Sequence, residues 1–197
     1  MVGNAKCLAA VALLISAACL SADAIDDGVR VVPATNLVMD GSEAERKGVA
    51  ILLEFAAEGC PYCVLLEEEF LKPMLRSGDY DNKVIMRVVD IDHGKSLTDF
   101  QGNRSTSAAF AHRFNVDLTP TVMLVNSRGK PLVEPIVGIW SLDFFGGVLD
   151  GRIDAAVDQV QQVKQAGHEN DSTAAHVESG TRQPAASSAT ERHLDRR

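Results

Sequence analysis

The chain has 197 residues, 46% of them hydrophobic, and its formal net charge at pH 7 is −8. This length is enough for one hydrophobic core and leaves little for a second. The negative balance lacks the basic footprint of a nucleic-acid-binding protein, so we expect no nucleic-acid partner.

Residues 1–24 have the pattern of a secretory signal peptide. The apolar run 7–20 is shorter than the roughly 20 residues of a membrane-spanning helix. A small-x-small cleavage pattern ends at Ala24, so we expect cleavage there and export to an oxidising compartment. The alternative is a lipid anchor on Cys19, although Ser16 stands where a lipobox usually has leucine.

The lead-in, residues 25–48, is expected to hold a short strand at 29–32 and a helix at 36–47. The core, residues 49–165, begins with Val49 to Phe55, a nearly continuous apolar run that predicts a strand buried on both faces. Further expected elements are a helix from Pro61 that Pro73 kinks or ends, a strand at 83–90, a helix at 105–114, a strand at 121–125 with a hairpin partner at 132–139, and a helix at 142–163 interrupted near 150–151. Strands that alternate with helices predict an α/β fold.

Residues 166–197 differ in composition from the core. They contain no aromatic residue and are rich in Ala, Ser, His, Glu and Arg. Such a segment buries too little apolar surface to offset its chain entropy, so we expect a disordered tail with solvated histidines.

A C-x-x-C motif, Cys60-Pro61-Tyr62-Cys63, stands at the junction between the buried strand and the following helix. This arrangement is typical of a dithiol/disulfide redox site. Loss of the signal peptide would leave these two cysteines alone in the mature chain. A disulfide between them closes a very short loop, which stabilises a fold little, so a redox role is favoured over a structural one.

The two cysteines have different expected roles. Cys60 would lie at a helix N-terminus, where free N–H groups and the helix dipole favour a thiolate, so we expect it to be the nucleophile. Cys63, nearly one turn later, would be the resolving thiol that releases the product.

Two segments carry a family resemblance. Residues 53–63 resemble the active-site strand and turn of the thioredoxin superfamily, and residues 115–121, with Thr119-Pro120-Thr121, resemble the segment before its cis-proline strand. The resemblance spans roughly residues 45–160. It implies a thioredoxin fold, a central mixed sheet flanked by helices on both faces. Overall the chain is most similar to secreted bacterial thioredoxin-like proteins of the SoxW, TlpA and DsbE kind.

This resemblance assigns roles to further residues. Glu54, six residues before Cys60, takes the place of a buried carboxylate; its apolar neighbours should raise its pKa, so that it acts as the base for Cys63. Pro120 would form the cis bond, and Thr119 would present its backbone to a substrate strand. Pro61 and Tyr62 would set the redox poise and contact substrate.

The expected function is a periplasmic thiol–disulfide oxidoreductase, most simply a reductase. Its partners would be exported protein thiols and disulfides and a membrane electron donor of the DsbD or CcdA type. We expect a monomer that has no cofactor. We also expect no metal site, because the spacings of Asp90, Asp92, His93 and His112 match no ligand motif. Alternatives are a DsbA-like oxidase, a DsbG-like isomerase, and a Cu(I) metallochaperone that binds through the two cysteines.

Overall fold

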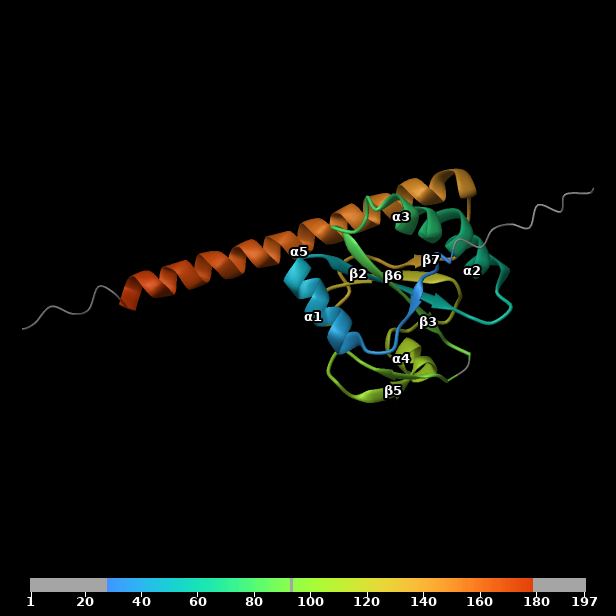
Figure 1. The fold of residues 1–197 in the computed structure, drawn as a ribbon, viewed down its shortest axis with the longest axis horizontal. Coiled ribbons are helices and arrows are strands. Elements are labelled where there is room, and N and C mark those ends of the chain that lie inside the picture. The colour runs from blue at the N-terminus through green and yellow to red at the C-terminus, as the bar shows by residue number, and fades with distance from the viewer. Residues whose placement is uncertain (1–27, 93, 179–197) are drawn as a thin grey trace, which may run out of the picture.

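The computed structural model describes residues 28–92 and 94–178. A five-stranded sheet in the order β1-β3-β2-β6-β7 lies at the centre, with helices on both of its faces (Figure 1). This is the α/β architecture expected from the sequence. The predicted signal peptide and the last 19 residues, 179–197, lie outside the described residues.

The sheet is mixed. Its first three strands in spatial order are parallel, and β6 and β7 are added antiparallel to β2 and to β6. The strands of this sheet are β1 (Val32–Pro33), β2 (Ala50–Ala56), β3 (Val84–Asp90), β6 (Thr121–Val125) and β7 (Ile136–Val137). The predicted strands therefore all occur, but the first and last are shorter than expected.

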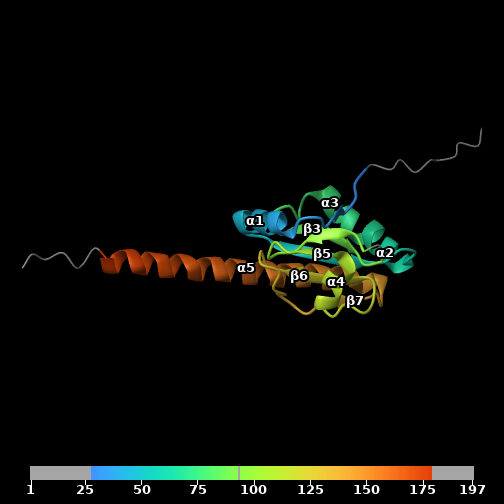
Figure 2. The same cartoon turned by 90° about the horizontal axis from the view of Figure 1, so that it is seen from below.

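Strand β2 runs through the middle of the core, which explains its apolar sequence. Its residues alternate between two hydrophobic clusters, so that Leu52 packs on one side of the sheet, and Leu53 and Phe55 pack on the other. The first cluster is covered by α2, α3 and α5, and the second by α1 and α4 (Figures 1 and 2).

The helices begin and end with recognisable caps. Asn36 accepts an N–H at the start of α1, and Gly48 ends that helix with a φ of 72°, a left-handed conformation that glycine adopts without strain. The helices are α1 (Leu37–Lys47), α2 (Pro61–Leu66), the π-helical turn η1 (Glu67–Leu71), α3 (Lys72–Ser77), α4 (Ser107–Arg113) and α5 (Leu142–Glu178).

Pro73 does not end the helix that begins at Pro61. The chain instead makes the π-helical turn η1 directly before it and continues as α3 to Ser77. The π turn is the local adjustment to a residue that has no N–H and whose ring would collide with an ordinary helical turn.

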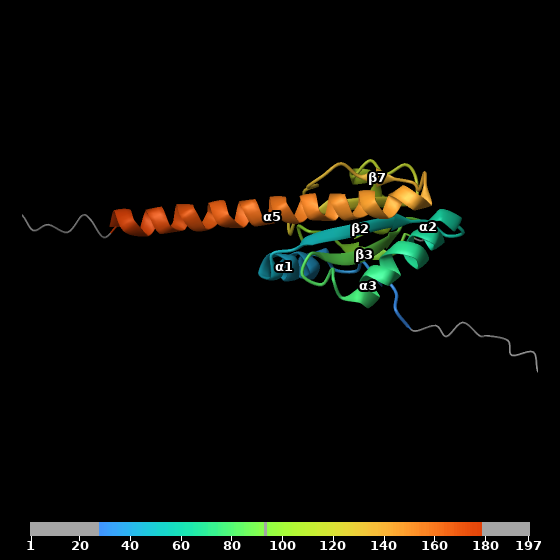
Figure 3. The ribbon, with the colours of Figure 1, turned by 90° about the horizontal axis from the view of Figure 1, so that it is seen from above.

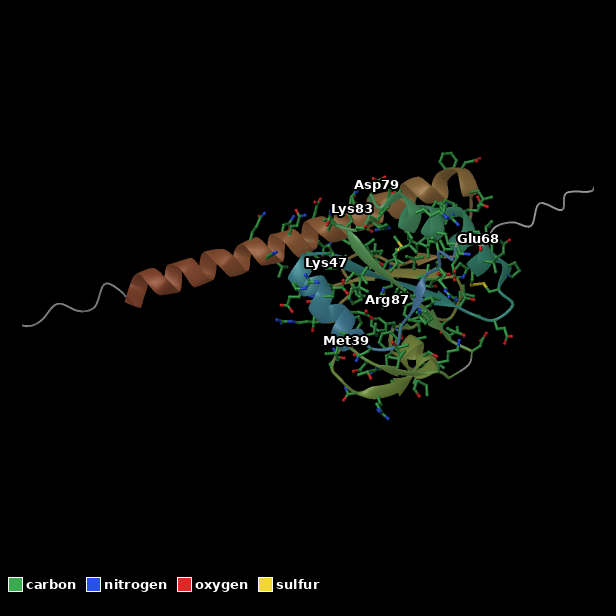
Figure 4. The ribbon with its side chains drawn as sticks, in the orientation of Figure 1. Met39, Lys47, Glu68, Asp79, Lys83 and Arg87 are labelled. Carbon is green, nitrogen blue, oxygen red and sulfur yellow. A yellow bond between two sulfur atoms is a disulfide. The ribbon has the colours of Figure 1, made fainter. Side chains whose placement is uncertain are left out.

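Helix α5 is longer and more regular than the sequence predicted. It is not interrupted at Asp150, because Tyr80 Oη donates a 2.6 Å hydrogen bond to that carboxylate and Leu149 and Ile153 are fully buried beside it. Lys83, which is labelled in Figure 4, adds a 2.7 Å ion pair to Asp154.

The same helix continues past the predicted start of the tail. It reaches Glu178 and extends well beyond the sheet, as Figure 3 shows. Residues 166–178 are therefore helical, where the sequence predicted the first part of a disordered tail. The helix can continue because each residue added to an existing helix gains a backbone hydrogen bond without a new nucleation cost.

A small hairpin was missed by the sequence analysis. Strands β4 (Ser96–Thr98) and β5 (Arg104–Thr106) pair antiparallel beside α4. Buried Asp99 closes their turn by accepting the N–H groups of Gln101 and Asn103 and a 2.8 Å bond from Arg113. Although burial opposes ionisation, these donors hold the pKa of Asp99 below its ordinary value.

None of the helices in the described part of the chain is both long enough and apolar enough to cross a membrane.

Replacing Asp99 with alanine should destabilise the fold. The change leaves two backbone N–H groups and Arg113 without their acceptor, which costs about 2 kcal/mol of unfolding free energy. Urea denaturation followed by circular dichroism measures this, with Asp158→Ala on the exposed side of α5 as the matched control. Equal stability of the two variants would contradict the role given to Asp99.

Candidate redox-active site

The C-x-x-C motif lies where the sequence placed it, at the transition from β2 to α2. Cys60 is the N-cap residue of α2, and Pro61 occupies the first turn, where a missing N–H leaves no hydrogen bond unmade. Cys60 and Cys63 form a disulfide with 5.3 Å between their Cα atoms. The Cys63 N–H also donates to Cys60 Sγ at 3.1 Å. Glu68, labelled in Figure 4, lies on the exposed side of the helix that follows.

The two sulfur-bearing residues differ in their access to solvent. Cys60 is partly exposed, whereas Cys63 is 5% exposed and is counted with the core. A substrate therefore reaches Cys60 first, which is the asymmetry that the predicted roles of nucleophile and resolving thiol require.

The loop before Cys60 is held in place from β3. Asp92 Oδ2 accepts the backbone N–H of Glu58 at 2.6 Å, and the N–H of Ile91 donates to the carbonyl of Ala56. Parallel pairing of Ala56 with Asp90 carries Asp92 to this position. Gly59 completes the loop with a φ of 68°. The sequence analysis considered Asp92 only as a possible metal ligand and missed this contact.

Pro120 lies at the same end of the sheet. The Thr119–Pro120 peptide bond is cis, as predicted. The next residue, Thr121, pairs with Phe55 near the end of β2, and the Pro120 carbonyl accepts the N–H of Gly138. The β2–β6 register thus brings Pro120 to the edge from which the cysteine loop emerges.

Large apolar side chains are exposed on the segments that meet at this end of the sheet. Tyr62 is 57% exposed between the cysteines, Leu118 is 65% exposed before the cis bond, and Val137, paired with Thr121, is 50% exposed. Exposed apolar residues that lie together mark a surface for contact with another molecule. Thr119, which follows Leu118 in the chain, is partly exposed.

Glu54 is buried, as the sequence predicted. Its side chain has no solvent exposure, and neither carboxyl oxygen has a hydrogen-bond partner. The residues in register with it on the two neighbouring strands are Val88 and Val122, so neither directly paired residue is a cation. Burial, with a smaller contribution from the charge of Glu67, raises its pKa to about 8.

Glu67 was missed as a site residue. It is only partly exposed, unlike its neighbours Glu68 and Glu69, and burial raises its pKa too. Its position four residues after Cys63 is the signal that was available, since residues with this spacing share one face of a helix.

Among the described residues, no group of three or more histidine, cysteine, aspartate or glutamate side chains is arranged to hold a metal ion. His93, one of the candidates, lies outside them.

Comparison with known proteins agrees with this geometry. Residues 37–151 match the family model described as a thioredoxin-like domain. No curated protein matches the chain significantly.

Solved structures of thioredoxins resemble the chain. Oxidised mitochondrial thioredoxin 3 from Saccharomyces cerevisiae is 18% identical, with a TM-score of 0.43 over 63% of this chain and 93% of that one. A poplar thioredoxin h is 19% identical, with a TM-score of 0.41 over 59% and 94%. Thioredoxin O2 from Arabidopsis thaliana is 21% identical, with a TM-score of 0.39 over 61% and 91%.

The family model covers more than half of the chain, including β2, both cysteines, the cis-proline and the start of α5. The chain therefore belongs to the thioredoxin-like domain family and has the fold and the paired cysteines of a thiol–disulfide oxidoreductase.

Proposed function

We propose that this protein reduces disulfides in exported proteins, in the periplasm of a bacterium. The observation that carries the proposal is one constellation of three groups: partly exposed Cys60 at the start of a helix, bonded to buried Cys63, with the unpaired carboxyl of Glu54 on the strand that leads into them. The signal-peptide pattern of residues 1–24 supports the location.

The reaction begins with the reduced pair. The thiolate of Cys60 attacks one sulfur of a substrate disulfide and releases the other substrate sulfur as a thiolate, which leaves a mixed disulfide. The N–H of Cys63 points at Cys60 Sγ and stabilises the negative charge there.

The second step releases the substrate. Glu54 takes the proton from the Cys63 thiol, and the resulting thiolate attacks Cys60 Sγ. The Cys60–Cys63 disulfide forms, and the second substrate sulfur leaves as a thiolate that water protonates. Two electrons pass from the protein to the substrate, so a dithiol donor must reduce the pair again. We assign that task to a membrane donor of the DsbD or CcdA type.

The substrate would bind at the exposed apolar surface around the disulfide. Tyr62 and Leu118 flank the cysteine loop and the cis bond, and partly exposed Thr119 lies between Leu118 and Pro120. An extended substrate segment would pair with the backbone of Thr119 and place its disulfide against Cys60, as in β-strand addition at an open edge.

The two cysteine variants test the exchange mechanism as a matched pair. Cys60→Ser should abolish insulin reduction because it lacks the attacking sulfur. Cys63→Ser should also stop turnover, but it should accumulate a mixed disulfide with substrate, which nonreducing electrophoresis and mass spectrometry detect. Turnover by Cys60→Ser, or an equal yield of mixed disulfide from both variants, would contradict the assignment of roles.

Glu54→Gln should slow release of substrate from the mixed disulfide by about 10²-fold, the lower end of what a positioned base contributes. Stopped-flow measurement of Cys63 attack on a mixed disulfide at Cys60 gives this rate directly. Glu69→Gln, which removes an exposed carboxylate from the π-helical turn η1 directly after α2, is the control and should leave the rate unchanged.

The same substitution should alter how stability depends on pH. With a folded pKa of about 8 against an ordinary value of 4.5, the folded protein holds one proton more than the unfolded chain between these limits. The unfolding free energy therefore falls as pH rises through this window, and Glu54→Gln removes that fall. Urea denaturation at about pH 5 and about pH 9 gives the change in unfolding free energy with pH for the wild type and for Glu54→Gln. The same change in both proteins would show that Glu54 ionises normally.

A further inference from the structure

A small pocket of about 190 Å³ opens at the β7 edge of the sheet, on the face that α4 covers. Thr121 and Met123 of β6 form its buried wall. Each is 3% exposed, and as alternate residues of one strand they face the same side of the sheet. Val137 of β7 is paired with Thr121 and so lies on that side as well. Because Val137 is exposed, the pocket is open to solvent here.

The segment after α4 supplies the opposite wall. Phe114 caps the end of that helix, and Asn115 turns the chain with a φ of 54°, a left-handed conformation that asparagine tolerates better than most residues. The chain then lines the pocket as far as Leu118. The ring of Phe114 packs against Phe110, with 4.9 Å between the ring centroids. Thr121 Oγ1 donates a 2.7 Å hydrogen bond to the Leu118 carbonyl, so this wall is fixed at both ends.

The interior of the pocket is apolar, and a negative charge lies at its rim. Met123, Val116 and the ring of Phe114 belong to the core cluster or pack against it, and all three line the pocket. The flexible side chain of a methionine adjusts to occupants of different shape. Asp117 lines the pocket too but is exposed. These groups favour a large apolar occupant, and the carboxylate of Asp117 repels an acidic one.

The size and place of the pocket indicate what occupies it. Pockets for small-molecule ligands and cofactors measure about 300–1,000 Å³. This pocket is smaller, and it shares a wall with the cis-proline segment, since Leu118 directly precedes Thr119 and Pro120. A substrate strand that pairs with the backbone of Thr119 presents its side chains alternately to the two sides. In such strand addition the main-chain hydrogen bonds give affinity, and pockets for the side chains give specificity.

We propose that this pocket binds one large apolar side chain, a leucine, methionine or phenylalanine, of the substrate segment that carries the disulfide. The inference rests on the proposed reductase function and names a substrate class for it: disulfides with such a side chain a few residues from the cysteine that Cys60 attacks. Pairing with Thr119 accepts any extended segment, whereas the pocket selects among them. The exchange reaction itself is unchanged.

The test uses peptides that differ in one residue. Each peptide has a single cysteine in disulfide linkage to mercaptoethanol, and each position near that cysteine is in turn leucine, phenylalanine, alanine or glutamate. The second-order rate constant for reaction with the reduced protein is measured by quenched flow and chromatography. At one position, the leucine and phenylalanine peptides should react about tenfold faster than the alanine peptide, and the glutamate peptide should be the slowest.

Two variants connect this preference to the pocket. Val137→Asp puts a charge at the rim and should lower the ratio of the leucine to the alanine rate constant to about one. Val163→Asp makes the same change at a 73% exposed position near the other end of the body and should keep the ratio. Asp117→Asn, an exposed substitution that the fold tolerates, should raise the rate constant of the glutamate peptide about fivefold relative to the alanine peptide.

A wild-type protein that reacts equally with all four peptides at every position overturns the proposal. It is also overturned if Val137→Asp keeps the preference of Val163→Asp, or if Asp117→Asn leaves the glutamate peptide as slow as before.

Failure of the proposed function has a different result, because the protein then reduces none of the peptides. Occupancy of the pocket is still measurable after chemical coupling of the leucine and the alanine peptide to Cys60 of a Cys63→Ser variant. The leucine peptide should shift the methyl NMR signal of Met123, which lines the pocket, and the alanine peptide should not. The same Met123 signal with both peptides overturns the pocket assignment, whatever the activity.

Discussion

The burial of β2 on both faces is the constraint on which the site depends. A strand in the middle of a mixed sheet has neighbours that fill both of its sides, so a carboxyl placed on it cannot reach water. Glu54 therefore remains without a partner between Val88 and Val122, and its pKa rises to about 8. The strand that stabilises the fold also supplies a carboxyl whose pKa lies close to neutral pH, where a general base exchanges protons most readily.

The same strand positions the sulfur atoms. Parallel pairing with β3 brings Asp92 under the loop after Ala56, and antiparallel pairing with β6 brings Pro120 alongside it. The loop then feeds Cys60 into the first turn of α2, which leaves one cysteine partly exposed and the other buried. The chemistry requires this asymmetry, and it follows from the register of three strands and one helix cap.

Much of this arrangement could be predicted from local patterns. The apolar run of β2 and the C-x-x-C at a strand end are short-range signals, and each predicted the correct element. The partial burial of Glu67 could not be read in this way, because a run of three glutamates is typical of a solvated face and burial of one of them depends on tertiary packing. The β4–β5 hairpin was missed for the same reason, since the long-range bond from Arg113 to Asp99 stabilises it. The continuity of α5 through Asp150 depends on Tyr80, which is 70 residues away from the Asp150 that it binds.

The most direct test of the central claim is the reduction potential of the Cys60–Cys63 pair, measured by equilibration with glutathione or dithiothreitol. A reductase that receives electrons from a membrane donor should have a potential near the roughly −270 mV of thioredoxin. A potential near about −120 mV, as in DsbA, would mean that the protein oxidises its substrates and would contradict the account.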